Sequence, residues 1–377
     1  MDNWIFRNGQ VLRDGALAVG DLAISAGKIA ESVRDGRVID ASGLLVLPGI
    51  VDIHGDAFER QMQPRPHVEF NPVFALAETE RQLLACGVTT AYHGVTLSWE
   101  PGLRSVEAWR GMLAAMAARD WVCDMRIHLR WEAFNLDALD QAVADIMAGR
   151  VHMLAFNDHT ASIVRKLAKP AEGAKYADRA GMKIEAFTEL ANRVLARADE
   201  VPAGLGRIAM AARAMQLPIA SHDDDTIEKR QRFHALGADI CEFPITEEVG
   251  QYAADEGQFV VMGSPNVVRG GSHLGWASAA DLAERGICRV LSSDYFYPCL
   301  LEAPFVIADR GKLDFAAAWA LVSANPARAA LLRDRGELAE SRRADVILVD
   351  PTTRNAVATF AGGRLAHLSA EGARRLG

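Results

Sequence analysis

A histidine and an aspartate two residues apart close an apolar stretch near the start of the chain, where residues 47–56 read LPGIVDIHGD. Side chains at positions i and i+2 leave a β-strand on the same face, so His54 and Asp56 can converge on one point at the strand end. An imidazole nitrogen and a carboxylate oxygen suit a borderline divalent metal ion. An isolated pair of this kind is more often an ordinary surface pair. Whether it is a metal site therefore depends on which other residues of the chain lie near it.

The middle of the chain alternates short apolar runs with helical stretches, as in GVTTAYHGV followed by SVEAWRGMLAAMAARD. This alternation predicts a parallel sheet with right-handed crossovers. About eight such units over roughly 300 residues favour a (β/α)8 TIM-type barrel, an α/β fold, over an open sheet.

In such a barrel, catalytic groups belong at the C-terminal ends of the strands. Residues that suit a metal ion end four further predicted strands: Glu132, His159, His222 and Asp294. Together with the first pair they make six nitrogen or oxygen ligands at five strand ends. The sequence therefore predicts a binuclear metal site.

Each of these four residues has a structural alternative. Glu132 could cap the next helix or pair with Arg130. His159 could merely cap a helix, and Asp158 beside it is a competing ligand. His222 precedes an acidic run, residues 223–225, that could only cap the following helix, and Asp294 could be an N-cap as well.

Both ends of the chain read as short β-strands joined by turns. Residues 1–47 carry Asn-Gly, Val-Gly-Asp and Ala-Gly-Lys turn signals, and a similar pattern with a Gly-Gly turn returns after residue 342. Chain ends often lie close together. We therefore expect residues 1–47 and 342–377 to form one β-sandwich domain beside a barrel domain of residues 48–341.

The composition limits the classes of partner. The chain has 377 residues, 50% of them hydrophobic, and a net charge of −8, which argues against a surface that coats nucleic acid. It has no apolar run of membrane-spanning length and no signal-peptide pattern at its start. The five cysteines are scattered and lack C-x-x-C spacing, which suggests reduced thiols. We expect a cytoplasmic protein that binds neither nucleic acid nor membrane.

The chain resembles the amidohydrolase superfamily of metal-dependent hydrolases through LPGIVDIHGD, ASHDD and SSDY, which cover nearly its whole length. More narrowly it is similar to the phosphonate-metabolism diphosphatases of that superfamily. The motifs that carry this likeness are PRPHVEF (64–70), HLRWE (128–132), ASHDD (220–224), GSPNVVRGGSH (263–273) and SSDYFYP (292–298).

The resemblance implies a barrel with a composite β-sandwich and two divalent metal ions, zinc first, with manganese or iron also suited. It also implies a bridging hydroxide, since bound metal lowers the pKa of water toward neutrality. Many relatives bridge their metals with a carboxylated lysine, but residues 29–165 contain no lysine. We expect Glu132 to supply the bridging carboxylate, and Asp294 to act as metal ligand and proton shuttle.

The family chemistry implied is hydrolysis of a sugar 5-triphosphate to diphosphate and the 5-phosphate, which needs cations around the phosphoryl oxygens. Arg269 is the first candidate, beside a Gly-Gly turn whose free N–H groups could approach a phosphate. The other substrate-binding candidates are His273, Arg65, Lys175 and Tyr176, the last two on an insert at 168–183 that could form a lid. Arg65 and Lys175 could equally be solvated surface charges. His128 and Arg130 either line the pocket or fill the barrel interior.

Three departures from the family pattern fall where substrate is held. The family has H-T-D-N where this chain has residues 54–57, His-Gly-Asp-Ala. It has Cys at Trp131 and Pro-Gly-Gln at residues 160–162. The departures remove no predicted ligand, so they weaken the triphosphate assignment more than the hydrolase assignment.

Two other functions remain open at this stage. A C–N hydrolase or deaminase acting on a small cyclic or amide substrate would keep the metals and need fewer cations than an anionic triphosphate. A non-catalytic binding protein would be expected to lack some of the six ligands, and all are present. A homodimer is the general expectation for such an enzyme.

Overall fold

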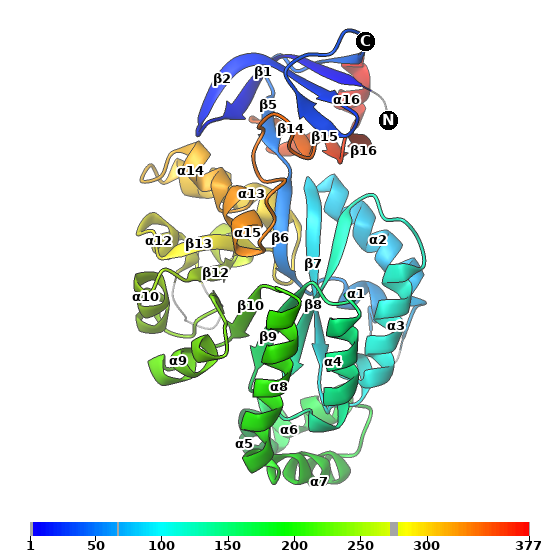
Figure 1. Ribbon diagram of the computed structural model, residues 1–377, viewed down its shortest axis with the longest axis vertical. Helices are drawn as coiled ribbons and strands as arrows, with labels where there is room; N and C mark the ends of the chain where they lie inside the picture. The colour runs from blue at the N-terminus through cyan, green and yellow to red at the C-terminus, as the bar shows by residue number, and fades with distance from the viewer. Residues whose placement is uncertain (1–2, 66–67, 272–277, 377) are drawn as a thin grey trace.

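The computed structural model describes residues 3–65, 68–271 and 278–376, and two eight-stranded sheets organise it (Figure 1). One sheet is parallel throughout and forms the barrel. The other combines strands from both ends of the chain and lies at one end of the molecule. The predicted barrel with a β-domain built from both termini is confirmed.

Each barrel strand pairs in parallel with its neighbour in the sequence. The strands are β6 Ile50–Gly55, β7 Val88–Leu97, β8 Asp124–Glu132, β9 Met153–Asn157, β10 Ile219–His222, β11 Ile240–Glu242, β12 Phe259–Gly263 and β13 Cys288–Ser292. All ten residues of β7 are buried, as expected for a parallel strand covered on both faces.

The barrel closes between its last strand and its first. At the C-terminal ends, the N–H of Asp294 donates to the carbonyl of His54 at 3.0 Å, and the N–H of Asp56 donates to the carbonyl of Asp294 at 2.9 Å. Farther down the seam, the carbonyls of Leu321 and Val322 accept from β13 and β6 respectively. The seam therefore joins the two strands that carry three of the predicted ligands.

Helices connect the strands, and several begin with a side chain that accepts from the first turn, as the serine N-cap of α3 does. The longer ones are α2 Pro72–Ala85, α3 Val106–Ala117, α4 Leu139–Met147, α8 Val201–Ala214, α9 Ile227–Ala235, α10 Glu247–Asp255 and α13 Pro298–Asp309. The shorter ones are α1 Glu59–Met62, α11 Ser264–Val268, α12 Ala279–Glu284, α14 Phe315–Ala320, α15 Ala324–Ala329 and α16 Ala370–Arg374.

Three helices between β9 and β10 form a unit with a hydrophobic core of its own. They are α5 Thr160–Leu167, α6 Pro170–Arg179 and α7 Ile184–Leu195, and Phe187 and Ala191 are fully buried among them. The unit lies at the end of the molecule opposite the β-domain (Figure 1). The predicted insert thus folds as helices packed on one another.

The β-domain has the strand order β16-β15-β14-β5-β1-β2-β3, with β4 paired to β1. Its strands are β1 Trp4–Arg13, β2 Ala16–Ser25, β3 Lys28–Ala30, β4 Arg37–Asp40, β5 Leu45–Pro48, β14 Val346–Asp350, β15 Asn355–Ala361 and β16 Arg364–Leu368. The antiparallel pairing of β5 with β14 joins the two chain ends, and Phe6 and Phe360 pack edge to face in their common core. In the described part of the chain, no helix has the length and apolar character needed to cross a membrane.

Candidate active site

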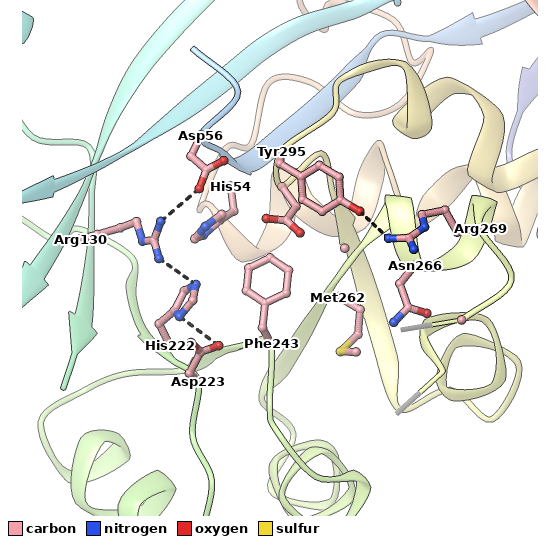
Figure 2. A pocket seen from close by; sticks show the side chains of 13 residues that line it. His54, Asp56, Arg130, His222, Asp223, Phe243, Met262, Asn266, Arg269 and Tyr295 are labelled. Atoms are coloured by element: carbon pink, nitrogen blue, oxygen red, sulfur yellow. Dashed lines mark hydrogen bonds and ion pairs between the residues drawn. The ribbon is translucent and has the colours of Figure 1, made fainter. Parts of the chain in front are cut away.

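A cavity of about 250 Å³ opens at the C-terminal ends of the barrel strands, the edge where the sequence predicts the site. Four predicted ligands line it, namely His54, Asp56, His222 and Asp294, and so does the predicted substrate residue Arg269. Figure 2 shows Asp56, Arg130 and His222 on one side and Asn266, Arg269 and Tyr295 on the other, with the ring of Phe243 between them.

Three residues within two positions of a strand end have left-handed backbone conformations. Asp223, Phe243 and Asp294 have φ angles of 54°, 52° and 54°. Residues other than glycine rarely adopt such angles, and they cluster at functional sites because the surrounding structure must hold them there. These turns redirect the side chains that follow β10, β11 and β13 around the cavity.

His54 and Asp56 leave β6 toward the cavity as predicted. His54 is 1% exposed, and burial lowers its pKa well below the usual value, so the imidazole is neutral and can offer a lone pair. Burial raises the pKa of Asp56, and Arg130 opposes that shift.

Asp52, earlier on the same strand, anchors the seam beneath this pair. Its carboxylate accepts from the N–H of Ser293 at 3.0 Å and from the Ser293 hydroxyl at 2.5 Å. Gly55 leaves room for this contact, because a Cβ there would lie 2.6 Å from Ser293 Oγ and 2.8 Å from Asp52 Oδ2. The glycine that departs from the family pattern is thus required by the packing around it.

Asp294, which follows β13, also lines the cavity. Burial, and then the nearby charge of Asp56, raises the pKa of Asp294 to about 7. A carboxyl group with a pKa near neutrality can both take up and release a proton at physiological pH. This property suits the proton shuttle that the resemblance implies.

A chain of polar contacts extends from β8 to β10. Both oxygens of Glu132 are engaged by the turn after β9: they accept from the N–H of His159 at 3.0 Å and lie 3.2 Å from His159 Nδ1. Nε2 of His159 is 3.5 Å from Asp223, and Asp223 is 3.2 Å from Nδ1 of His222. Burial disfavours the charge on His159, but the contacts with Asp223 and Glu132 outweigh it and raise its pKa to about 9. Glu132 therefore orients His159, and its predicted bridging role remains a prediction.

Arg130 lies in the middle of the predicted ligand set. Its side chain is 9% exposed, and it donates to Asp56 Oδ2 at 3.4 Å and to His222 Nε2 at 3.2 Å (Figure 2). The sequence analysis left open whether Arg130 lines the pocket or fills the barrel interior, and the structure shows that it lines the pocket.

Two groups of three side chains bring possible metal-ligand atoms within 4.8 Å of one another. One group is His159, His222 and Asp223, and the other is His54, His128 and Glu242. Sequence reasoning did not select Glu242 or Asp223. The strand-end criterion could have found Glu242, because it is the last residue of β11.

The predicted substrate residues are spread more widely than expected. Arg269 reaches the cavity and donates to the Tyr295 hydroxyl at 3.3 Å. Arg65 is exposed and does not line the cavity, nor do Lys175 and Tyr176 of α6, where the Tyr176 hydroxyl instead accepts from Lys166. His273 lies outside the described residues.

The expectation of free N–H groups at the Gly-Gly turn was wrong. The N–H of Gly270 donates to the carbonyl of Val267 at 3.1 Å, and the N–H of Gly271 donates to that of Asn266 at 2.9 Å. The turn closes the end of α11 and so uses these donors internally.

A relative in Escherichia coli (strain K12), the α-D-ribose 1-methylphosphonate 5-triphosphate diphosphatase, is 30% identical over 359 residues, which cover 91% of this chain and 94% of the relative. A Bacillus cytotoxicus dihydroorotase is 40% identical over 58 residues, 14% of each chain. No protein-family model matches the chain.

Solved structures with a similar fold include N-acetylglucosamine-6-phosphate deacetylase from Pasteurella multocida, with a TM-score of 0.63 and 10% identity over 96% of this chain and 99% of the other. The dihydropyrimidinase from Brevibacillus agri has a TM-score of 0.60 and 14% identity over 98% and 95% of the two chains. At these identities the likeness concerns the fold alone.

Proposed function

Because the chain belongs to the amidohydrolase superfamily, in the family of the Escherichia coli diphosphatase, we propose that it hydrolyses α-D-ribose 1-methylphosphonate 5-triphosphate and releases diphosphate. The observation that carries the proposal is the combination of metal-ligand groups with a guanidinium on each wall of one cavity. Imidazoles and carboxylates suit the metal ions, and the two arginines suit phosphoryl oxygens.

We assign two divalent ions, zinc before manganese or iron, to the six predicted ligands His54, Asp56, Glu132, His159, His222 and Asp294. When bound, such ions lower the pKa of water toward neutrality and offset charge on the phosphoryl oxygens. The neutral imidazole of His54 and the short chain from Glu132 to His222 fit this use.

In the proposed reaction, water attacks the α-phosphorus and the bond from that phosphorus to the bridging oxygen of the diphosphate breaks. Asp294 accepts a proton from the attacking water and passes a proton to the products. The products are the 5-phosphate and diphosphate. The pKa of Asp294, raised to about 7 by burial, suits both halves of this transfer.

Arg130 and Arg269 would hold the triphosphate from opposite walls. Each guanidinium now pairs with a neighbour, Arg130 with Asp56 and Arg269 with Tyr295, and an anion would replace or share those contacts. Hydrogen bonds between guanidinium and phosphate are charge-assisted and can be bidentate.

The alternative, hydrolysis of a C–N bond, is favoured by the small number of cations. Among the described residues that line the cavity, Arg130 and Arg269 are the two with a permanent positive charge. A small amide or cyclic substrate needs only a few polar anchors, which these residues could supply.

The deciding experiment follows the triphosphate by phosphorus NMR with zinc- or manganese-loaded protein in water enriched in oxygen-18. Metal-dependent release of diphosphate, with the label in the 5-phosphate, is the expected result. Asp294→Asn should slow release by about 10²–10⁴-fold. Asp225→Asn, which changes a carboxylate 63% exposed in the same acidic run, should leave it unchanged. If the loaded protein leaves triphosphates intact and hydrolyses amides or lactones, the alternative replaces the proposal.

A further inference from the structure

Three side chains converge inside the barrel beneath the cavity, from strands that are not neighbours in the sheet. His54 comes from β6, His128 from β8 and Glu242 from β11. Nδ1 of His54 is 3.0 Å from Glu242 Oε2, and Nε2 of His128 is 3.8 Å from the same oxygen. The side chains are 1%, 0% and 0% exposed, so water from the bulk does not reach them.

None of the converging atoms has a hydrogen-bond partner in the described part of the protein. This applies to His54 Nδ1, to His128 Nε2 and to both carboxylate oxygens of Glu242. A buried polar atom without a partner is destabilising, and more so when it is charged. Four such atoms at one point call for a group that binds them all.

The hydrogen-bond partner of His128 indicates that the missing group is a cation. Its Nδ1 lies 3.1 Å from the carbonyl oxygen of Ile53, which can only accept, so Nδ1 carries the hydrogen. In the neutral ring, Nε2 is then a bare lone pair that faces a carboxylate. Two electron-rich groups at close range repel each other unless a cation lies between them.

The spacing suits a metal ion better than a shared proton. The separation of 3.8 Å between His128 and Glu242 is too long for a hydrogen bond. Around tetrahedral zinc, with bonds of about 2.1 Å, ligand atoms lie roughly 3.4 Å apart. The observed separations of 3.0 and 3.8 Å lie on either side of that distance.

We propose that His54, His128 and Glu242 form a buried three-ligand site for a divalent cation of the zinc type. Three protein ligands leave one position of a tetrahedral ion open, as in catalytic zinc sites. Of these three ligands, His54 also belongs to the set predicted from strand ends, whereas His128 and Glu242 do not. This site rests on the proposed function only in that the enzyme requires a metal ion. It does not depend on which substrate the enzyme hydrolyses.

Backbone hydrogen bonds fix the chain at Glu242 and at the residue after it. The Glu242 carbonyl accepts from the N–H of Asp223 at 3.0 Å, which joins β11 to the turn after β10. Phe243, in its left-handed conformation, donates its N–H to Val261 at 2.9 Å and packs its ring 4.9 Å from that of His54. These contacts position Glu242 and His54 at the ends of their strands.

The first test measures metal content and needs no substrate. Wild-type protein, stripped by a chelator and reloaded with zinc or cobalt(II), should bind one more ion per chain than His128→Gln or Glu242→Gln, or bind it at least a hundredfold more tightly. His93→Gln is the matched control and should keep the wild-type content. His93 is a fully buried barrel histidine whose two ring nitrogens have no hydrogen-bond partner among the described residues. Equal content and affinity in all four proteins would overturn the proposal.

Crystals of the zinc-loaded wild type provide a second test that does not depend on any variant folding. Anomalous scattering at the zinc edge should show an ion about 2.1 Å from His128 Nε2 and from a Glu242 oxygen. Ions found only elsewhere in the barrel would overturn the proposal, even if diphosphate is released. An ion at the trio in a protein that leaves triphosphates intact would support it and count only against the proposed substrate.

Discussion

Replacing Arg130 by methionine is expected to change metal binding and anion binding in opposite directions. Methionine keeps much of the length of the side chain and removes its charge. Asp56 and His222 then lose their hydrogen bonds from the Arg130 guanidinium. A metal ion at either residue no longer has to displace a cation, and a phosphate loses one of its guanidinium partners.

The expected changes in metal affinity and triphosphate affinity can be estimated from the interactions that Arg130 makes. Two unit charges about 4 Å apart interact by about 4 kcal/mol at an effective dielectric constant of about 20. If relaxation leaves roughly a third of that, metal affinity rises about tenfold, since each 1.4 kcal/mol is a factor of ten. A lost charge-assisted hydrogen bond of about 1.5–3 kcal/mol weakens triphosphate binding by about tenfold to a hundredfold.

Metal affinity is measured by titration against a chromogenic chelator, and anion affinity by inhibition with inorganic triphosphate. Arg269→Met is the control, because Arg269 contacts Tyr295 and neither Asp56 nor His222, so it should weaken only the anion. An Arg130→Met variant that binds metal no more tightly than wild type, or whose affinities for metal and anion change in the same direction, would contradict this expectation.

Three further outcomes are expected. Asp294→Asn should lower kcat for diphosphate release by about 10²–10⁴-fold with KM nearly unchanged, because proton transfer is lost and binding is retained; a change confined to KM would contradict the shuttle. Ser293→Ala should lower the free energy of unfolding by about 1.5–3 kcal/mol, measured in urea, because it removes a buried hydrogen bond to Asp52. Burial lowers the pKa of His93 to about 4, so between pH 6.5 and 4 the unfolded chain binds a proton that the folded chain does not. The free energy of unfolding therefore falls as the pH falls, by about 3 kcal/mol across that window. His93→Gln should flatten this part of the stability profile, and an unchanged slope would mean that other groups cause it.

The barrel could be predicted because strand–helix alternation is a property of the sequence, and the strand-end rule then placed His54, Asp56, His222 and Asp294 around one cavity. The rule does not predict in which direction a side chain points when its residue follows the end of the strand. Asp223 was interpreted as part of a capping run, and its left-handed backbone brings it between two histidines instead.

Contacts between distant segments account for the other differences. Glu242 and His128 lie on separate strands, and only closure of the barrel brings them together. Lys175 and Tyr176 belong to a helix that packs within α5–α7, and the sequence did not reveal which neighbour that helix would choose.

The close packing at Gly55 links the identities of three residues. A threonine at this position, as in the family pattern, would collide with Ser293 and Asp52 as they stand here. Gly55→Thr alone should therefore be harmful, while the same change could be tolerated after the Asp52–Ser293 contact is altered. The order in which substitutions arise would then decide which of them survive. The predicted metal-binding motif at the end of β6 could change only together with residues of the seam that adjoins it.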